Sequence, residues 1–314
     1  MCTSICEKGK YGLFGRTLDL ECSYSESVAV TPRNFKLDFL YEGTLCSHTA
    51  IIGIAHVSGG IPLYYDAMNE EGVFAAGLNF PGNAVYNEVK EGFFNVASFE
   101  FITFVLTKCR SVAEARELLL KTNITCDSFA EKLPATPLHF IVADKHDCIT
   151  VEPLKEGLKI YDNPFGVLTN NPPFDFHTVN IANFASLSST SPENKLCPEV
   201  ELPRYSRGMG AIGLPGDYSS PSRFARATFV KNHTAHGADE MGEVNRFFHI
   251  MDTVSVPLGC VKTDEGLDVL TVYTSCASAE SGRYFYTTYE DRSIRSLSFG
   301  EAELDGNAVF SKLI

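Results

Sequence analysis

The chain has 314 residues, 44% of them hydrophobic, and a formal net charge of −13 at pH 7. This length and hydrophobic content suffice for one large domain with a substantial core. The acidic balance and the lack of a basic cluster argue against a nucleic-acid backbone or an anionic membrane surface as a partner. The chain has no charged leader with an apolar stretch, so we expect a cytoplasmic protein whose ten cysteines are reduced.

The amino-terminal part is predicted to form mainly β-strands. Its first segment has the pattern of a hairpin, with strands over residues 2–6 and 11–16 joined by a turn that contains Gly9. Folding about Gly9 is expected to place Cys2 roughly across from Arg16. The further strands predicted in this part cover residues 27–31, 50–57, 63–65 and 73–80.

Helical and strand segments alternate in the rest of the chain. A buried helix is predicted over residues 96–108, and the capping box Ser111–Glu114 opens a second helix that runs to about Lys121. The later predicted elements are strands at 138–143, 148–153, 158–161 and 167–169, helices at 222–231 and 239–254, and strands at 267–274, 283–289 and 293–297. This order is typical of an α+β protein with mainly antiparallel sheets, and no linker divides it, so we expect a single domain over residues 1–314.

Cys2 is the first candidate for chemistry. If Met1 is removed, Cys2 carries a thiol and a free α-amine, whose usual pKa values of ~8.5 and ~7.7–8.0 let one residue serve as nucleophile and base. A guanidinium such as Arg16 would favour the thiolate, and the carboxylate of Asp19 would hold the amine. A small second residue is compatible with methionine removal, so we expect the working chain to begin at Cys2. The alternative is that Cys2 is a small buried hydrophobe beside a surface ion pair.

Three further segments carry polar side chains at places where elements meet. Asn79 and Asn170 each end a predicted strand, where an amide facing a thiol would suit the oxyanion of acyl transfer, although Asn before Gly or Pro is also an ordinary turn residue. Arg223 lies at a predicted helix start with Ser222 as a candidate cap. The helix dipole disfavours a cation there, which indicates either a function elsewhere or a salt bridge with Asp217.

Histidines suggest two other sites, and neither is well supported. His233 and His236 with Asp239 lack a second set of metal ligands, so a solvated loop is the better interpretation. No Cys and His pair of papain type is recognisable, and His139 beside Leu138 is more simply a core histidine. We therefore expect no metal and no organic cofactor.

Taken together, these segments resemble the bile salt hydrolases of the choloylglycine hydrolase family, N-terminal nucleophile hydrolases that include the penicillin V acylases. The resemblance covers nearly the whole chain and rests on seven motifs in order, at residues 1–4, 14–19, 76–82, 167–172, 213–217, 222–224 and 286–291. It implies a four-layer αββα sandwich of two mainly antiparallel sheets.

The resemblance also implies a set of catalytic residues around the terminal thiol: Cys2, Arg16, Asp19, Asn79, Asn170 and Arg223. Cys2 is the implied nucleophile, and the implied oxyanion donors are the backbone N–H of Asn79 and the side chain of Asn170. Asn171 follows Asn170 directly, which leaves a one-residue ambiguity in this assignment.

The implied substrate is a bile salt conjugated to glycine or taurine, hydrolysed at its amide bond. Asn79 stands where penicillin V acylases tend to have tyrosine, and the resemblance maps a steroid pocket to four apolar residues, Leu18, Phe129, Leu133 and Leu138. It further implies a homotetramer with residues 186–213, which include the most irregular stretch at 186–205, as the contact arm. The alternatives are an acylase acting on penicillin V or N-acyl homoserine lactones, and a non-enzymatic protein that binds steroids or fatty acids.

Overall fold

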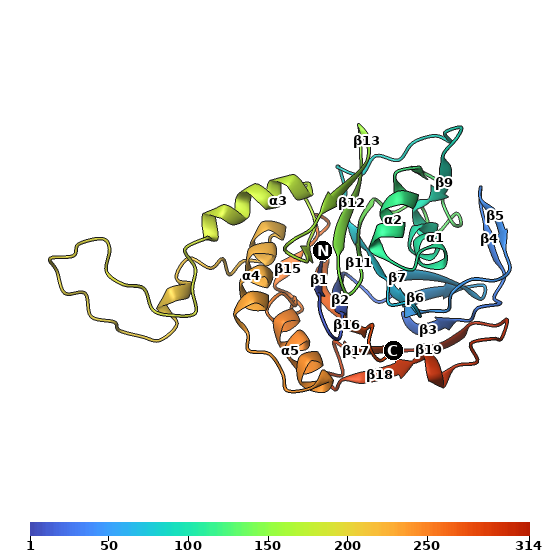
Figure 1. Ribbon diagram of the computed structural model, residues 1–314. Helices are drawn as coiled ribbons and strands as arrows, with labels where there is room; N and C mark the ends of the chain where they lie inside the picture. Colours follow the sequence, from blue (N-terminus) through green and yellow to red (C-terminus); the bar gives the residue numbers. More distant parts are fainter.

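Two antiparallel sheets form the centre of the computed structural model, which describes residues 1–314 (Figure 1). The first sheet has the strand order β14-β1-β2-β16-β17-β18, with β15 beside β16. Its strands are β1 (Cys2–Glu7), β2 (Leu13–Leu20), β14 (Val167–Leu168), β15 (Val261–Lys262), β16 (Asp268–Ser278), β17 (Arg283–Thr288) and β18 (Arg295–Ser298). Because the amino-terminal strand β1 pairs with both β2 and β14, it is an inner strand of the sheet, and residue 2 stands at its end, paired with Leu18.

The second sheet has the order β13-β12-β11-β8-β7-β6-β3-β19. Its strands are β3 (Ser27–Thr31), β6 (Ile51–Ser58), β7 (Ile61–Asn69), β8 (Phe74–Asn79), β11 (Leu138–Ala143), β12 (Cys148–Leu154), β13 (Gly157–Asp162) and β19 (Phe310–Leu313). Most neighbours in this sheet are also neighbours in the chain, because short turns favour antiparallel pairing.

Helices cover the outer face of each sheet. The helices α1 (Phe101–Lys108) and α2 (Val112–Leu119) pack on the second sheet, and α4 (Ser220–His233) and α5 (Glu240–Asp252) pack on the first (Figure 1). The remaining elements are the short helix α3 (Phe174–Asn180), the hairpin β4 (Leu37–Phe39) and β5 (Gly43–Leu45), the parallel pair β9 (Phe94–Ala97) and β10 (Thr122–Thr125), and 3-10 turns at Ser98–Glu100, Ile181–Phe184, Met209–Ala211 and Phe299–Glu301. The expected αββα sandwich is confirmed.

The core lies on both faces of the second sheet. On β11, Ile141 and Ala143 belong to the cluster between the sheets, whereas Phe140 and Val142 face α1 and α2. Phe140 stacks on Phe101 of α1 with ring centroids 3.8 Å apart. Strands covered on both faces lose the alternation of polar and apolar residues, which is why β8 and β11 are almost continuously apolar.

The helix predicted over residues 96–108 is shorter in the structure, and this expectation was wrong at its start. Residues 94–97 form β9, and α1 begins only at Phe101. The carboxylate of Glu100 explains the change, because it accepts the backbone N–H of Leu40 at 2.8 Å and that of Ala97 at 3.2 Å. The predicted cap of α2 is confirmed, since the Ser111 side chain accepts the N–H of Glu114.

The amino-terminal hairpin has a different register from the predicted one. Cys2 pairs with Leu18, and Arg16 pairs with Ser4, so Arg16 is diagonal to Cys2 rather than opposite. The cause is a longer connection, residues 8–12, which contains two glycines with positive φ, +113° at Gly9 and +55° at Gly12. Moving the centre of the turn by one residue shifts the pairing by two.

Residues 185–208 contain no helix or strand and extend away from the sandwich (Figure 1). Apolar side chains on this arm face solvent, with Leu196 90% and Tyr205 81% exposed. The predicted irregular excursion is therefore present. All ten cysteines of the chain are free thiols. None of the helices has both the length and the apolar character needed to cross a lipid bilayer.

Candidate active site

Cys2 lies at the start of β1 and is buried, with 2% of its surface exposed. The guanidinium of Arg16 donates to Sγ of Cys2 at 2.5 Å, and the backbone N–H of Cys2 donates to Oδ1 of Asn170 at 2.9 Å. Met1 precedes it in this structure, and the terminal amine of Met1 donates to the carbonyl oxygen of Asp19 at 2.8 Å. The sulfur and the nitrogen of residue 2 thus each have one polar partner from a distant part of the chain.

Arg16 is held in a gap between β7 and β8. The pairing of these strands ends at Asp66 and Ala76, and a register irregularity beside β6 leaves Tyr65 as an extra residue in β7. Nη1 of Arg16 fills the gap and donates to the carbonyl oxygens of Tyr65 at 3.2 Å and Gly77 at 2.6 Å. The guanidinium therefore crosses from the first sheet to the second.

The charge on Arg16 is secured although the side chain is only 1% exposed. Burial by itself lowers the pKa of Arg16, but the negative charges around it, Cys2 first among them, outweigh burial and raise the pKa above its ordinary value. A permanent cation in contact with the sulfur stabilises negative charge on Cys2.

Asp19 is also fully buried, and its carboxylate accepts hydrogen bonds from two hydroxyls, Thr271 at 2.7 Å and Thr17 at 3.1 Å. Burial raises the pKa of Asp19, while the charges of Arg223 and the terminal ammonium oppose that rise. The expected hydrogen bond from the amine of residue 2 to this carboxylate is not formed while Met1 is present. Asp19 instead contacts the terminus through its main-chain oxygen.

Arg223 supplies a second buried cation next to Cys2. Its Nη1 donates to the carbonyl oxygen of Cys2 and to Oγ1 of Thr3, the latter at 2.6 Å. Its Nη2 donates to Oδ1 of Asn170 at 2.7 Å. Arg223 lies in the first turn of α4, and these contacts show that its side chain points back to the first sheet. Burial lowers the pKa of the Arg223 guanidinium.

The alternative salt bridge between Arg223 and Asp217 is wrong. Asp217 accepts the hydroxyl of Ser222 at 2.6 Å and the backbone N–H of Ser219 at 2.9 Å. Hydrogen bonding from the Ser219 side chain first, then from the Ser222 hydroxyl and the Ser219 backbone, lowers the pKa of Asp217 to about 2. The predicted cap Ser222 is also corrected, because α4 begins at Ser220 and Ser222 lies inside it.

Asn170 connects the two strand ends that the sequence singled out. Its Nδ2 donates to the carbonyl oxygen of Asn79 at 2.7 Å, which leaves the second hydrogen of this amide group available. The side chain of the neighbouring Asn171 points elsewhere, and its Nδ2 donates to the carbonyl oxygen of Pro81 at 2.7 Å and to Oδ1 of Asn83 at 3.0 Å. Only Asn170 of the two reaches Cys2.

The backbone N–H of Asn79 points away from β11. Asn79 is paired with Leu138, and the adjacent Phe80 donates to the carbonyl oxygen of Pro137 at 2.8 Å, so Asn79 occupies a pair without mutual hydrogen bonds. Its N–H and C=O therefore face the side on which β7 has separated from β8.

A cavity of about 410 Å³ adjoins Cys2 at this gap. The four predicted pocket residues, Leu18, Phe129, Leu133 and Leu138, all line it, together with Cys2, Arg16 and Asn79. The lining also includes residues that the sequence interpretation missed, among them Leu63, Tyr65, Phe99 and Ile102. Nothing in the sequence separates Leu63, Tyr65, Phe99 and Ile102 from ordinary core residues, because their place beside the cavity depends on the tertiary structure.

The predicted alternatives based on histidine have no counterpart in the structure. No group of three or more His, Cys, Asp or Glu side chains is arranged to hold a metal ion. His236 contacts Glu243 at 3.1 Å, and His233 bonds to the carbonyl oxygen of Phe229 on its own helix. His139 is buried and bonded on both sides, as expected for a core histidine.

The fold and this geometry define a class of protein, the N-terminal nucleophile hydrolases. A buried sulfur in contact with a cation, beside neutral N–H donors and an apolar cavity, is suited to attack on the carbonyl carbon of an acyl compound.

Comparison with known proteins supports this class. The sequence pattern of the choloylglycine hydrolase family, described as linear amide C-N hydrolases, matches residues 2–312. The chain is 44% identical to the "Bile salt hydrolase/transferase" of Lactiplantibacillus plantarum, an alignment that covers 99% of this chain and 96% of the relative. It is 37% identical to the protein of the same name from Clostridium perfringens, with coverage of 98% and 95%.

Solved structures agree with the sequence comparison. A mutant of the conjugated bile acid hydrolase from Clostridium perfringens superposes with a TM-score of 0.92 and 35% identity, covering 100% of this chain and 97% of that one. Penicillin V acylase from Agrobacterium tumefaciens, at 20% identity, has the same fold with a TM-score of 0.78 and coverage of 99% and 90%. The chain belongs to the choloylglycine hydrolase family and is an amide C–N hydrolase.

Proposed function

We propose that this enzyme hydrolyses the amide bond between a bile acid and glycine or taurine. The observation that carries the proposal is the Cys2 sulfur in contact with Arg16 beside a largely apolar cavity. A steroid conjugate has a large hydrocarbon surface and one amide, and such a cavity removes the hydrocarbon from water while the amide reaches the sulfur. The names of the relatives from Lactiplantibacillus plantarum and Clostridium perfringens support the same substrate class.

In the proposed mechanism, removal of Met1 converts the nitrogen of Cys2 into an α-amine. Oδ1 of Asn170 already accepts a hydrogen bond from this nitrogen at 2.9 Å, and we propose that the Asp19 carboxylate also holds the freed amine. The amine takes the proton of the Cys2 thiol, and the resulting thiolate attacks the amide carbonyl carbon and forms a C–S bond. The protonated amine then gives that proton to the nitrogen of the departing glycine or taurine as the C–N bond breaks, which leaves a thioester on Cys2. Water activated by the same amine then cleaves the thioester and releases the bile acid. The steps use no metal and no organic cofactor.

The negative charge of the tetrahedral intermediate needs donors that are in place beforehand. The backbone N–H of Asn79 and the free hydrogen on Nδ2 of Asn170 are the proposed donors. A hydrogen bond from Nδ2 of Asn170 to the carbonyl oxygen of Asn79 joins the two residues, and it holds the two proposed donors at a fixed distance from each other. Arg16 and Arg223 complete the positive surroundings of Cys2.

The test compares Cys2→Ala with Cys109→Ala, a matched change of another buried cysteine that does not line the cavity. Both are assayed on glycocholate, taurocholate and penicillin V, after mass spectrometry confirms the first residue of the wild-type protein. We expect folded Cys2→Ala to be inactive and Cys109→Ala to retain activity. Substantial hydrolysis by Cys2→Ala would refute the nucleophile. Turnover of penicillin V alone would favour the acylase alternative, and unchanged but bound conjugate would favour a binding protein.

We also propose a cytoplasmic homotetramer in which residues 186–213 form the contact arm. The exposed apolar side chains Leu196, Leu202 and Tyr205 support an arm that is covered by another copy. Light scattering of wild-type protein and of a Leu196→Asp/Tyr205→Asp variant tests it. We expect a tetramer that dissociates in the variant, and a monomeric wild type would contradict the proposal.

A further inference from the structure

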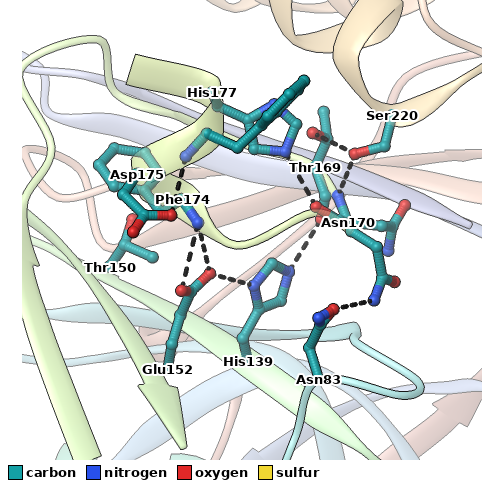
Figure 2. A network of polar contacts seen from close by, with 12 residues as sticks. Asn83, His139, Thr150, Glu152, Thr169, Asn170, Phe174, Asp175, His177 and Ser220 are labelled. Atoms are coloured by element: carbon teal, nitrogen blue, oxygen red, sulfur yellow. Dashed lines mark hydrogen bonds and ion pairs between the residues drawn. The ribbon is translucent and has the colours of Figure 1, made fainter. Parts of the chain in front are cut away.

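His139 and Glu152 form a buried polar pair that does not line the cavity (Figure 2). His139 is on β11 and Glu152 on the adjacent strand β12, and neither side chain is exposed. Nδ1 of His139 lies 3.0 Å from Oε1 of Glu152, and Nε2 lies 3.0 Å from the carbonyl oxygen of Thr169. The ring of Phe80 stacks on the imidazole with centroids 4.2 Å apart. The ring plane is thus set by packing and by two polar contacts.

Counting donors shows which hydrogens the two contacts of His139 require. The Thr169 carbonyl only accepts, and an ionised Glu152 only accepts, whereas a neutral imidazole has a single N–H. Both contacts of His139 are hydrogen bonds only if Nδ1 and Nε2 both carry hydrogen, or if Glu152 is protonated and donates to Nδ1. In either arrangement the pair has no net charge, which suits its complete burial.

The pair reaches both ends of the segment that carries Asn170. His139 contacts Thr169, which directly follows β14 of the first sheet, although His139 itself belongs to the second. Glu152 accepts the backbone N–H of Phe174, the first residue of α3, with its two oxygens at 3.0 and 3.2 Å. Residues 169–174 are therefore tied at each end to one buried pair (Figure 2).

Two further contacts fix the backbone of Asn170 itself. Its N–H donates to Oγ of Ser220 at 2.8 Å, and its carbonyl oxygen faces Nε2 of His177 at 3.0 Å. With the main chain held on both sides, the amide side chain extends toward Cys2 and Arg223.

We propose that His139 and Glu152 are positioning residues for amide hydrolysis, because their hydrogen bonds lock residues 169–174 and thereby aim the side chain of Asn170 at Cys2. Neither residue touches the cavity, so they act on the reaction rather than on substrate affinity. The proposal rests on the function proposed above for Cys2 and Asn170. Small displacements of a positioned group are known to reduce turnover by about 100-fold.

The central experiment compares Glu152→Gln with Glu152→Leu. The amide of Gln donates to Nδ1 of a neutral His139, and its oxygen accepts from Phe174, so both contacts survive in this variant. We expect kcat of Glu152→Gln within about threefold of the wild type. Glu152→Leu keeps the volume and loses both contacts, so kcat falls by about 10- to 100-fold while KM changes by less than about threefold.

A double-mutant cycle separates positioning from general loosening of the fold. If Glu152 acts through Asn170, adding Glu152→Leu to Asn170→Ala produces no further fall in kcat. Independent falls that multiply would overturn the proposal, as would unchanged kcat in folded Glu152→Leu or a loss above about 30-fold in folded Glu152→Gln.

A measurement on the wild-type protein decides the matter even if Glu152→Leu does not fold. Nitrogen NMR of protein labelled with ¹⁵N-histidine is expected to show hydrogen on Nε2 of His139, and a bare Nε2 would overturn the proposal because the bond to Thr169 would not exist. Wild-type hydrolysis is assayed in parallel. Its absence would count against the proposed function, whereas normal hydrolysis with insensitive Glu152 variants would count against positioning alone.

Discussion

Acid should weaken this fold through His177 specifically. The residue lies on α3 with no exposed surface, and its Nε2 contacts the carbonyl oxygen of Asn170 at 3.0 Å. Burial lowers the pKa of His177 from 6.5 to about 4. The folded chain therefore keeps a neutral imidazole at a pH at which the unfolded chain has already bound a proton.

The size of the effect follows from linkage. The folded-state pKa lies below the unfolded value, so the contribution of His177 is complete above pH 6.5 and is lost as pH falls toward 4. At 1.36 kcal/mol for each unit of pKa, the difference corresponds to about 3 kcal/mol of unfolding free energy. That is a large part of the stability of a typical domain.

The matched variant is His177→Gln, whose amide can still donate to Asn170 but does not titrate. Urea unfolding of both proteins is followed by circular dichroism between about pH 7 and pH 4. We expect the wild type to lose about 3 kcal/mol more than the variant over this range, because every other titrating group is shared. Parallel pH dependence of the two proteins would refute a neutral buried imidazole at position 177.

Three other changes test the site and the frame around it. Arg16→Met removes the cation from the sulfur and should lower kcat/KM at least about 100-fold in steady-state assays, and near-normal turnover would contradict the role of the contact. Leu133→Glu places a charge in the apolar cavity and should raise KM about tenfold or more, whereas a loss in kcat alone would speak against a substrate pocket there. Gly15→Ala brings a Cβ within 2.0 Å of the Ser275 carbonyl oxygen and should cost about 3 kcal/mol in unfolding free energy, while Gly216→Ala, which meets nothing within 4 Å, should stay within about 0.5 kcal/mol.

Local patterns in the sequence predicted most elements of the sandwich. Apolar runs between turn residues marked β8, β11 and β12, and the cap at Ser111 marked the start of α2. The helix start was misplaced because β9 pairs with β10, a partner from beyond α1 and α2, and the apolar residues Val96 and Ala97 suit either state equally well.

The amino-acid sequence alone determined which chemical groups this enzyme has: a thiol on residue 2, two arginines, and amides at two strand ends. Only the tertiary structure decided how they meet, because Arg16 needs the gap between β7 and β8, and Asn170 needs a fold that brings it to Cys2. His139 shows the same limit, since a core position in β11 becomes a tie to Thr169 only across two sheets. Contacts between residues far apart in the chain depend on how sheets register and pack, which no local pattern encodes.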